Sequence, residues 1–155
     1  MIYKGLNLKI PRRYLPDFLR VVDWTESQGF LRPGQVSLRP PLWSDPTQRG
    51  KYDPQRGLAL VYRVPGWQDS GPGTLVHELV HHWQYDPAQG EYRESQGWVA
   101  PRTGKTSRAR YLLDPLEIQA YWWENQYSLW WLGEEIPEVK EYRALGVHLS
   151  QFPRE

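Results

Sequence analysis

Two histidines and a glutamate stand close together in the run His77-Glu78-Leu79-Val80-His81, which has the spacing of an HExxH motif. Histidines four residues apart lie one above the other on a helix, so both imidazoles can bind the same zinc ion. Glu78 is rotated by about 100° from His77 around the helix axis, which places its carboxylate beside a metal-bound water rather than on the metal. The three residues therefore predict a zinc site with a general base next to it.

The residues around the motif predict the helix that such a site needs. Apolar side chains share one broad side of a helical wheel, namely Leu75, Val76, Leu79, Val80 and Trp83. The motif's polar residues fall on the other side, and a plain amphipathic helix with solvated histidines is the alternative interpretation. His82 is rotated by about 100° from His81 and cannot bind the same ion without distortion, so we interpret it as a residue at the boundary of the core.

The composition limits both the fold and the kinds of ligand. A chain of 155 residues is long enough for one core, so we expect a single domain over 1–155. The chain has no cysteine, so a metal must be bound by His, Asp or Glu, and a net charge of +1 provides no general attraction to nucleic acid. Segment 1–11 lacks the apolar core of a signal peptide, and no apolar run reaches membrane-spanning length. We therefore expect a cytoplasmic protein with no membrane partner.

Turn residues and apolar runs predict the elements that position the motif. In chain order we expect a helix over 16–29, a strand over 35–39, turns over 41–57, a strand over 58–64 and a loop over 66–73. The motif helix follows and should end at Asp86-Pro87. The strand over 58–64 either exposes an edge above the metal, where an extended peptide could pair with it, or lies inside the sheet.

A catalytic zinc site usually has three protein ligands, so the motif lacks one. A second helix is predicted to begin at Pro115, with Asp114 as its N-cap. Glu117 and Ala120 lie on a small, polar face of this helix, which would let the motif helix approach closely. The Glu117 carboxylate could then reach the ion.

Other interpretations of these residues remain open. Glu117 also fits a capping box with Asp114, in which its carboxylate only accepts hydrogen bonds from backbone N–H groups. Asp114, Glu124 and His148 are alternative third ligands. On spacing alone, the metal ligand and the capping residue are equally good interpretations of Glu117.

Two further segments could bind a partner. Segment 88–112 is polar and without periodicity, and its basic residues could favour nucleic acid or an acidic substrate, although such runs are commonly solvated loops. The second helix carries the pairs Trp122-Trp123 and Trp130-Trp131, which make it apolar over most of its circumference. Such a helix is typically buried, and a homodimer surface is the alternative.

The motif and the second helix resemble the gluzincin metallopeptidases, and within them the small single-domain minigluzincins. The resemblance covers roughly residues 57–128 and rests on His77-Glu78-Leu79-Val80-His81, Trp83-Gln84 and the ExxA-like run Glu117-Ile118-Gln119-Ala120. It implies an α+β, zincin-like fold with a small, mostly antiparallel sheet, an edge strand over the site, an active-site helix and a glutamate helix. It also implies that His77, His81 and Glu117 bind zinc and that Glu78 is the catalytic base. The first 56 residues have no counterpart in the resemblance.

The expected activity is zinc-dependent hydrolysis of a peptide bond. Zinc lowers the pKa of its water to about 7 and polarises the scissile carbonyl, while Glu78 moves the proton from the water to the leaving amine. Tyr121, one turn after Glu117, is our candidate donor to the developing oxyanion, and simple packing is its alternative role. Glu124 could orient a ligand imidazole through a hydrogen bond.

Two other functional classes are compatible with the sequence. One is a zincin-like metal-binding module, regulatory or partner-binding, that has no general protease activity. The other is a nucleic-acid-binding protein that uses the segment from Arg93 to Arg110, although the near-neutral net charge weakens this interpretation. Metal content separates the last class from the first two, and turnover separates the metallopeptidase from the binding module.

Overall fold

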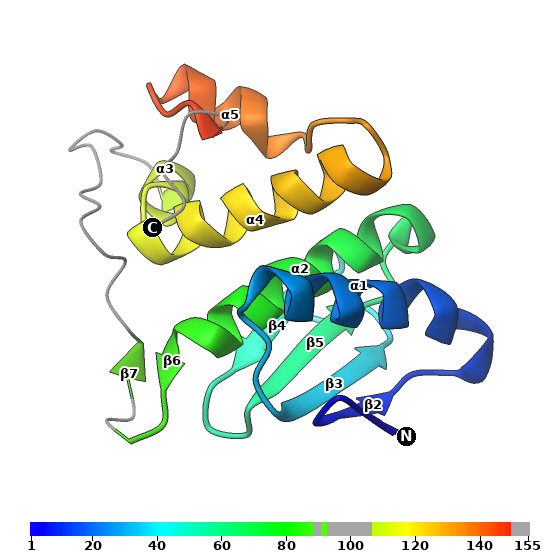
Figure 1. Ribbon diagram of the computed structural model, residues 1–155. Coiled ribbons are helices and arrows are strands. Elements are labelled where there is room, and N and C mark those ends of the chain that lie inside the picture. Colours follow the sequence, from blue (N-terminus) through cyan, green and yellow to red (C-terminus); the bar gives the residue numbers. More distant parts are fainter. Residues whose placement is uncertain (89–90, 93–106, 150–155) are drawn as a thin grey trace. The chain divides into compact units, whose positions relative to one another are not determined.

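The computed structural model describes residues 1–88, 91–92 and 107–149, which belong to two compact units within 1–92 and 93–155. The elements of the first unit are β1 (Ile2–Tyr3), β2 (Leu6–Lys9), a 3-10 turn (Arg12–Tyr14), α1 (Leu15–Gln28), β3 (Gly34–Arg39), β4 (Gly50–Asp53), β5 (Leu58–Tyr62), α2 (Trp67–Gln84), β6 (Tyr85–Asp86) and β7 (Glu91–Tyr92). Those of the second unit are α3 (Ser107–Leu112), α4 (Pro115–Trp131) and α5 (Glu138–Ala144) (Figure 1). The expectation of a single domain stays a prediction.

The main sheet has five strands in the order β1-β2-β3-β5-β4. The outer pairs β1/β2 and β4/β5 are antiparallel, whereas the central pairs β2/β3 and β3/β5 are parallel. A small sheet in a mixed α and β fold is therefore confirmed, but the expectation of a mostly antiparallel sheet is wrong. The physical reason is that α1 carries the chain from the end of β2 back to the start of β3, and such a helical crossover joins parallel strands.

Both long helices of the first unit lie on the same face of this sheet (Figure 1). Helix α2 packs against β5, β4 and α1. The buried apolar side chains between the layers include Phe18, Val21 and Val22 of α1, Val36 and Val61 of the sheet, and Leu75, Val76, Leu79 and Val80 of α2. The predicted apolar side of the motif helix is thus confirmed as core for these four residues of α2, whereas Trp83 is only half-buried.

Strand β5 lies between β3 and β4, so the interpretation of the strand over 58–64 as an internal strand is correct. All five of its residues are buried, as expected when both faces of a strand are covered. The edge next to it belongs to β4, which lies inside the segment 41–57 that we expected to form turns. Turn residues at both ends of β4 conceal it in the sequence, and its strand conformation depends on pairing with β5.

Helix α2 begins earlier than the sequence predicts. Its first residue is Trp67, so the expected loop over 66–73 is mostly helical and includes Pro72 inside the helix. The Trp67 ring meets the Tyr14 ring edge-on with centroids 4.6 Å apart, and both Gly71 and Pro72 are buried. Tertiary packing here outweighs the low helix propensity of glycine and proline.

The second unit is built around α4. Asp114 caps this helix as predicted, because its side chain accepts a hydrogen bond from the Leu116 backbone N–H at 2.9 Å. Apolar side chains of α3, α4, α5 and the segment after α5 form the core, including Leu112, Ile118, Trp122, Val139, Tyr142 and Leu149. Trp130 and Trp131 are exposed, so the expectation of a fully buried helix holds for its first part only. A homodimer through these tryptophans stays a prediction.

Two other expectations concern the segment 88–112 and the presence of membrane-spanning helices. Helix α3 lies within the segment 88–112 that we expected to be aperiodic, and the basic residues between 93 and 106 lie outside the described residues. In the part of the chain that is described, every helix is too short or too polar to span a membrane.

Gly34 should be essential for the fit between α2 and the sheet, and Gly71 should not. A Cβ on Gly34 would lie 2.6 Å from His82 Nε2 and 2.8 Å from the Gly57 carbonyl oxygen, whereas a Cβ on Gly71 finds its nearest neighbour at 3.5 Å. We expect Gly34→Ala to lower the free energy of unfolding by about 1–3 kcal/mol. Gly71→Ala should leave it unchanged or raise it by up to about 1 kcal/mol, because alanine favours the helix.

Urea unfolding of the two variants and the wild type, with a chelator present to remove the contribution of bound metal, measures both changes. Equal stability of Gly34→Ala and the wild type would contradict the close contact between α2 and the sheet.

Candidate metal centre

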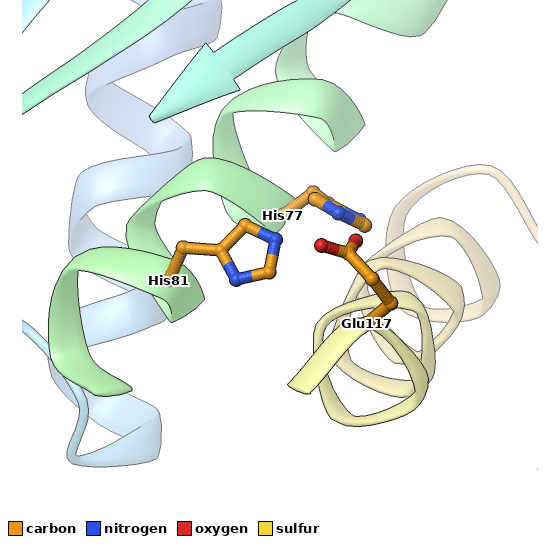
Figure 2. Close-up of side chains that lie close together, drawn as sticks. All are labelled: His77, His81 and Glu117. Carbon is orange, nitrogen blue, oxygen red and sulfur yellow. The ribbon is translucent and has the colours of Figure 1, made fainter. Parts of the chain in front are cut away.

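His77 and His81 lie one turn apart on α2, as the motif predicts. Both side chains are buried, with 4% and 7% of their surface exposed. Their ring centroids are 4.8 Å apart and the ring planes are inclined by 78°. Figure 2 shows the two rings extending from neighbouring turns of the helix. Two imidazoles held this closely could supply two ligands to one metal ion.

The Glu78 carboxylate lies between α2 and the edge strand β4. Its side chain is 6% exposed. A Cβ on Gly50, the first residue of β4, would lie 3.0 Å from Glu78 Oε2. Burial raises the pKa of Tyr62, and the negative charge of Glu78 adds to this rise. Gly50 thus leaves space for the carboxylate at the start of the edge strand.

His82 is not a member of the candidate ligand group, and its ring forms hydrogen bonds elsewhere. Its Nδ1 lies 2.7 Å from the Tyr52 hydroxyl and its Nε2 lies 2.7 Å from the Pro33 carbonyl oxygen. Burial lowers the pKa of this imidazole. Both ring nitrogens of His82 therefore have partners in or next to the sheet, and the residue is buried rather than at the boundary of the core.

Glu117 lies in the first turn of α4 and is half-buried. In a capping box its carboxylate would accept the backbone N–H of Asp114, but this N–H donates to the Tyr111 carbonyl oxygen at 3.3 Å. The Tyr111 hydroxyl forms a side-chain hydrogen bond with Glu117. These contacts favour a role for Glu117 other than capping.

His77, His81 and Glu117 form a group that could hold a metal ion. Each offers one ligand atom, and the three atoms lie within 4.8 Å of one another (Figure 2). Two imidazoles and a carboxylate are a usual donor set for catalytic zinc, and ligands about 2.1 Å from a tetrahedral ion are about 3.4 Å apart. The chemistry of the three donors therefore fits a zinc ion. The rival ligands Asp114, Glu124 and His148 are not members of the group.

Three tyrosines cluster in the unit that carries Glu117. The Tyr121 hydroxyl lies 3.2 Å from the Tyr111 hydroxyl, and the Tyr121 ring meets the rings of Tyr111 and Tyr142 edge-on. The pKa of Tyr111 is raised by burial, then by the charge of Glu117 and by Tyr121. The pKa of Tyr142 is raised mainly by burial, with contributions from Tyr121 and Glu117. The hydroxyls of Tyr111 and Tyr142 are therefore neutral at physiological pH.

Tyr111 is a site residue that the sequence motifs do not predict. Tyr111 belongs to α3, which lies in the segment that we interpreted as an aperiodic loop. The buried residues Ala109, Leu112 and Leu113 have the three- and four-residue spacing of a helix face, and this short pattern was the available signal.

Comparisons with protein-family models, with curated proteins and with solved structures find no match to this chain. The resemblance to gluzincins therefore rests only on the HExxH motif, the following Trp83-Gln84 and the ExxA-like run.

The tyrosine cluster predicts opposite effects for two matched substitutions. Tyr121→Phe removes a buried hydroxyl that is hydrogen-bonded to Tyr111, so we expect it to lower the free energy of unfolding by about 0.5–1.5 kcal/mol. Among the described residues the buried Tyr142 hydroxyl has no hydrogen-bond partner, so Tyr142→Phe should be neutral or stabilising. Denaturant titrations of both variants provide the measurement. Equal losses in the two variants would show that the hydrogen bond contributes nothing specific.

Proposed function

We propose that this protein is a zinc-dependent metallopeptidase in which His77, His81 and Glu117 bind the ion and Glu78 is the general base. The observation that supports the proposal most is the group of three ligand atoms within 4.8 Å of one another. The two histidines come from the HExxH run, and the glutamate comes from the run that resembles the gluzincin ExxA element. Both motifs therefore contribute to the same donor set.

The chain's own residues would supply the proton transfer. A bound zinc ion lowers the pKa of a water to about 7 and polarises a carbonyl group. Glu78 would accept the proton of the attacking water and transfer it to the leaving amine. A carboxylate within hydrogen-bond distance of the water can act as such a general base and acid. Its carboxylate adjoins Gly50, where an added Cβ would lie 3.0 Å from Oε2, so the strand backbone limits the directions in which it can turn.

A tyrosine hydroxyl would stabilise the developing oxyanion. Tyr121, the donor chosen from the sequence, is 5% exposed, and its hydroxyl is within hydrogen-bond distance of Tyr111. Tyr111 is 41% exposed and also contacts the proposed ligand Glu117. We propose that Tyr121 orients the Tyr111 hydroxyl and that the two act as one donor unit.

The edge strand β4 is our candidate for the peptide-binding element. An edge strand carries backbone groups that can pair with an extended peptide. Gly50 at the start of β4 adjoins Glu78, so a peptide paired with this strand would pass close to the proposed base.

The same donor set also supports the alternative of a metal-binding module without general protease activity. In that case the ion would serve structure or regulation, and Glu78 would have no catalytic task. The nucleic-acid alternative depends on the basic segment from Arg93 to Arg110, most of which lies outside the described residues.

Metal content and turnover together test the proposal. We expect about one zinc per chain in the wild type and in Glu78→Gln, and loss of zinc in Glu117→Ala, because two imidazoles alone bind the ion weakly. Glu78→Gln should cleave peptides about 10²–10⁴-fold more slowly than the wild type, since it retains the ligands but lacks the base. Elemental analysis and mass spectrometry of a random peptide mixture measure the two quantities.

His148→Ala is the matched control, because it removes an exposed histidine outside the ligand group and should keep both zinc and activity. A wild type without zinc would overturn the proposal. Zinc with the same cleavage products and rates in the wild type and Glu78→Gln would leave the binding module as the function.

Gly50 provides a separate test of the geometry around the base. A Cβ at this position would lie 3.0 Å from Glu78 Oε2 and 2.5 Å from Thr74 Cγ2. We expect Gly50→Ala to displace the carboxylate and to lower kcat at least about tenfold, with the zinc content unchanged. The double variant Gly50→Ala/Thr74→Ser removes the collision with Thr74 Cγ2, so it separates the effect on Glu78 from a loss of stability.

Lys9→Ala, which changes an exposed residue of β2 in the same sheet, serves as the control and should keep full activity. Wild-type kcat in the double variant would contradict the proposed contact between the edge strand and the base.

A further inference from the structure

The last turn of α2 contains a side-chain hydrogen bond that can determine which ring nitrogen of His81 carries the proton. His81 Nδ1 lies 2.8 Å from Oε1 of Gln84, three residues further along the helix. We infer that Gln84 is a positioning residue: its side-chain carbonyl accepts the Nδ1 proton of His81 and so places the lone pair on Nε2, the nitrogen that would bind the ion. This inference rests on the proposed function for the identity of the ligand, but it concerns the metal-free protein.

Burial makes this hydrogen bond decisive for the imidazole. Gln84 is 1% exposed, so water does not compete for its amide. A neutral imidazole carries one proton, so a proton fixed on Nδ1 leaves a lone pair on Nε2. If the Gln84 amide were turned around, its NH₂ group would donate to Nδ1 and the His81 proton would occupy Nε2, which blocks metal binding there. The orientation of one buried amide thus decides whether His81 is a ligand.

Three sets of hydrogen bonds fix the position of this turn. The Arg32 guanidinium donates to the carbonyl oxygens of His82 and Tyr85, the latter at 2.8 Å, and its positive charge lies at the negative end of the helix. The His82 ring is bound between Tyr52 and the Pro33 carbonyl. The Tyr85 N–H donates to the carbonyl oxygen of His81 itself. The backbone between His81 and Gln84 therefore has little conformational freedom.

A purely structural role for Gln84 makes different predictions. A glutamine that only satisfies buried polar groups would affect stability, and it would leave the tautomer of His81 unchanged. A positioning residue changes the tautomer and the zinc affinity, because the partner of a ligand imidazole fixes its orientation and basicity. The two roles can be separated with Gln84→Met, which has similar size and no acceptor, and with Gln84→Glu, which keeps an acceptor.

The experiment uses the full chain labelled with ¹⁵N-histidine, first metal-free at mildly alkaline pH and then titrated with zinc against a chelator. We expect NMR of the metal-free wild type to show His81 protonated on Nδ1. Gln84→Met should shift this proton largely to Nε2 and weaken zinc binding about 10–100-fold. Gln84→Glu should restore the Nδ1 proton and bind zinc at least as tightly as the wild type. Gln68→Met, at an exposed position on the same helix, should change neither quantity.

The outcomes separate this inference from the proposed function. A His81 proton on Nε2 in the metal-free wild type, or an unchanged tautomer in Gln84→Met, overturns the role of Gln84 whatever the protein binds. A proton on Nδ1 that moves in Gln84→Met supports the positioning role even if zinc does not bind, and in that case the metallopeptidase proposal fails alone. If Gln84→Met does not fold, Gln84→Glu still tests the inference, because a proton on Nε2 in that variant contradicts it.

Discussion

The close approach of α2 to the sheet is the constraint on which the candidate site depends. Gly50 faces Thr74 and Glu78, and Gly34 faces His82, at distances that exclude a side chain on either glycine. Because both ends of the motif segment meet strand backbone in this way, the helix fits in one rotational position only. A shift by one residue would rotate the histidines by about 100° and move both out of line with any common ligand. The missing side chains of two glycines therefore determine where the imidazoles lie.

This position of the helix buries polar groups, which is unfavourable unless each has a partner. His77, Glu78, His81, His82 and Gln84 are all buried in the final turns of α2. A helix that served only to pack on the sheet would carry apolar residues at these sites and would be more stable. The chain instead provides Tyr52, Pro33 and Arg32 as partners from the sheet and the segment before it. A structure that retains so many polar groups at a cost in stability is typical of a site under functional selection.

Features that depend on local geometry could be predicted from the sequence, and those that depend on distant partners could not. The helical spacing of His77 and His81 and the cap at Asp114 follow from backbone geometry within a few residues. Strand β4 is different, because its strand conformation depends on pairing with β5. Its first residue, Gly50, is typical of a turn in the sequence, yet the contact with Glu78 requires a glycine there. The early start of α2 likewise depends on the packing of Trp67 against Tyr14. The residues for which the sequence predicts the wrong secondary structure are thus the ones whose tertiary contacts position the motif.

The same distinction explains how a motif can indicate chemistry when comparisons with known proteins find no match. An HExxH run specifies its geometry through the helix alone, so it can work in any fold that covers one side of that helix. No such local spacing specifies the third ligand or the hydrogen-bond partner of each imidazole. In this chain Gln84 fills the second role from within the same helix, three residues after His81. On this proposal the orientation of His81 is encoded locally as well. The two proposed ligand imidazoles, the proposed base and the residue that orients one ring then all lie in a run of eight residues, 77–84.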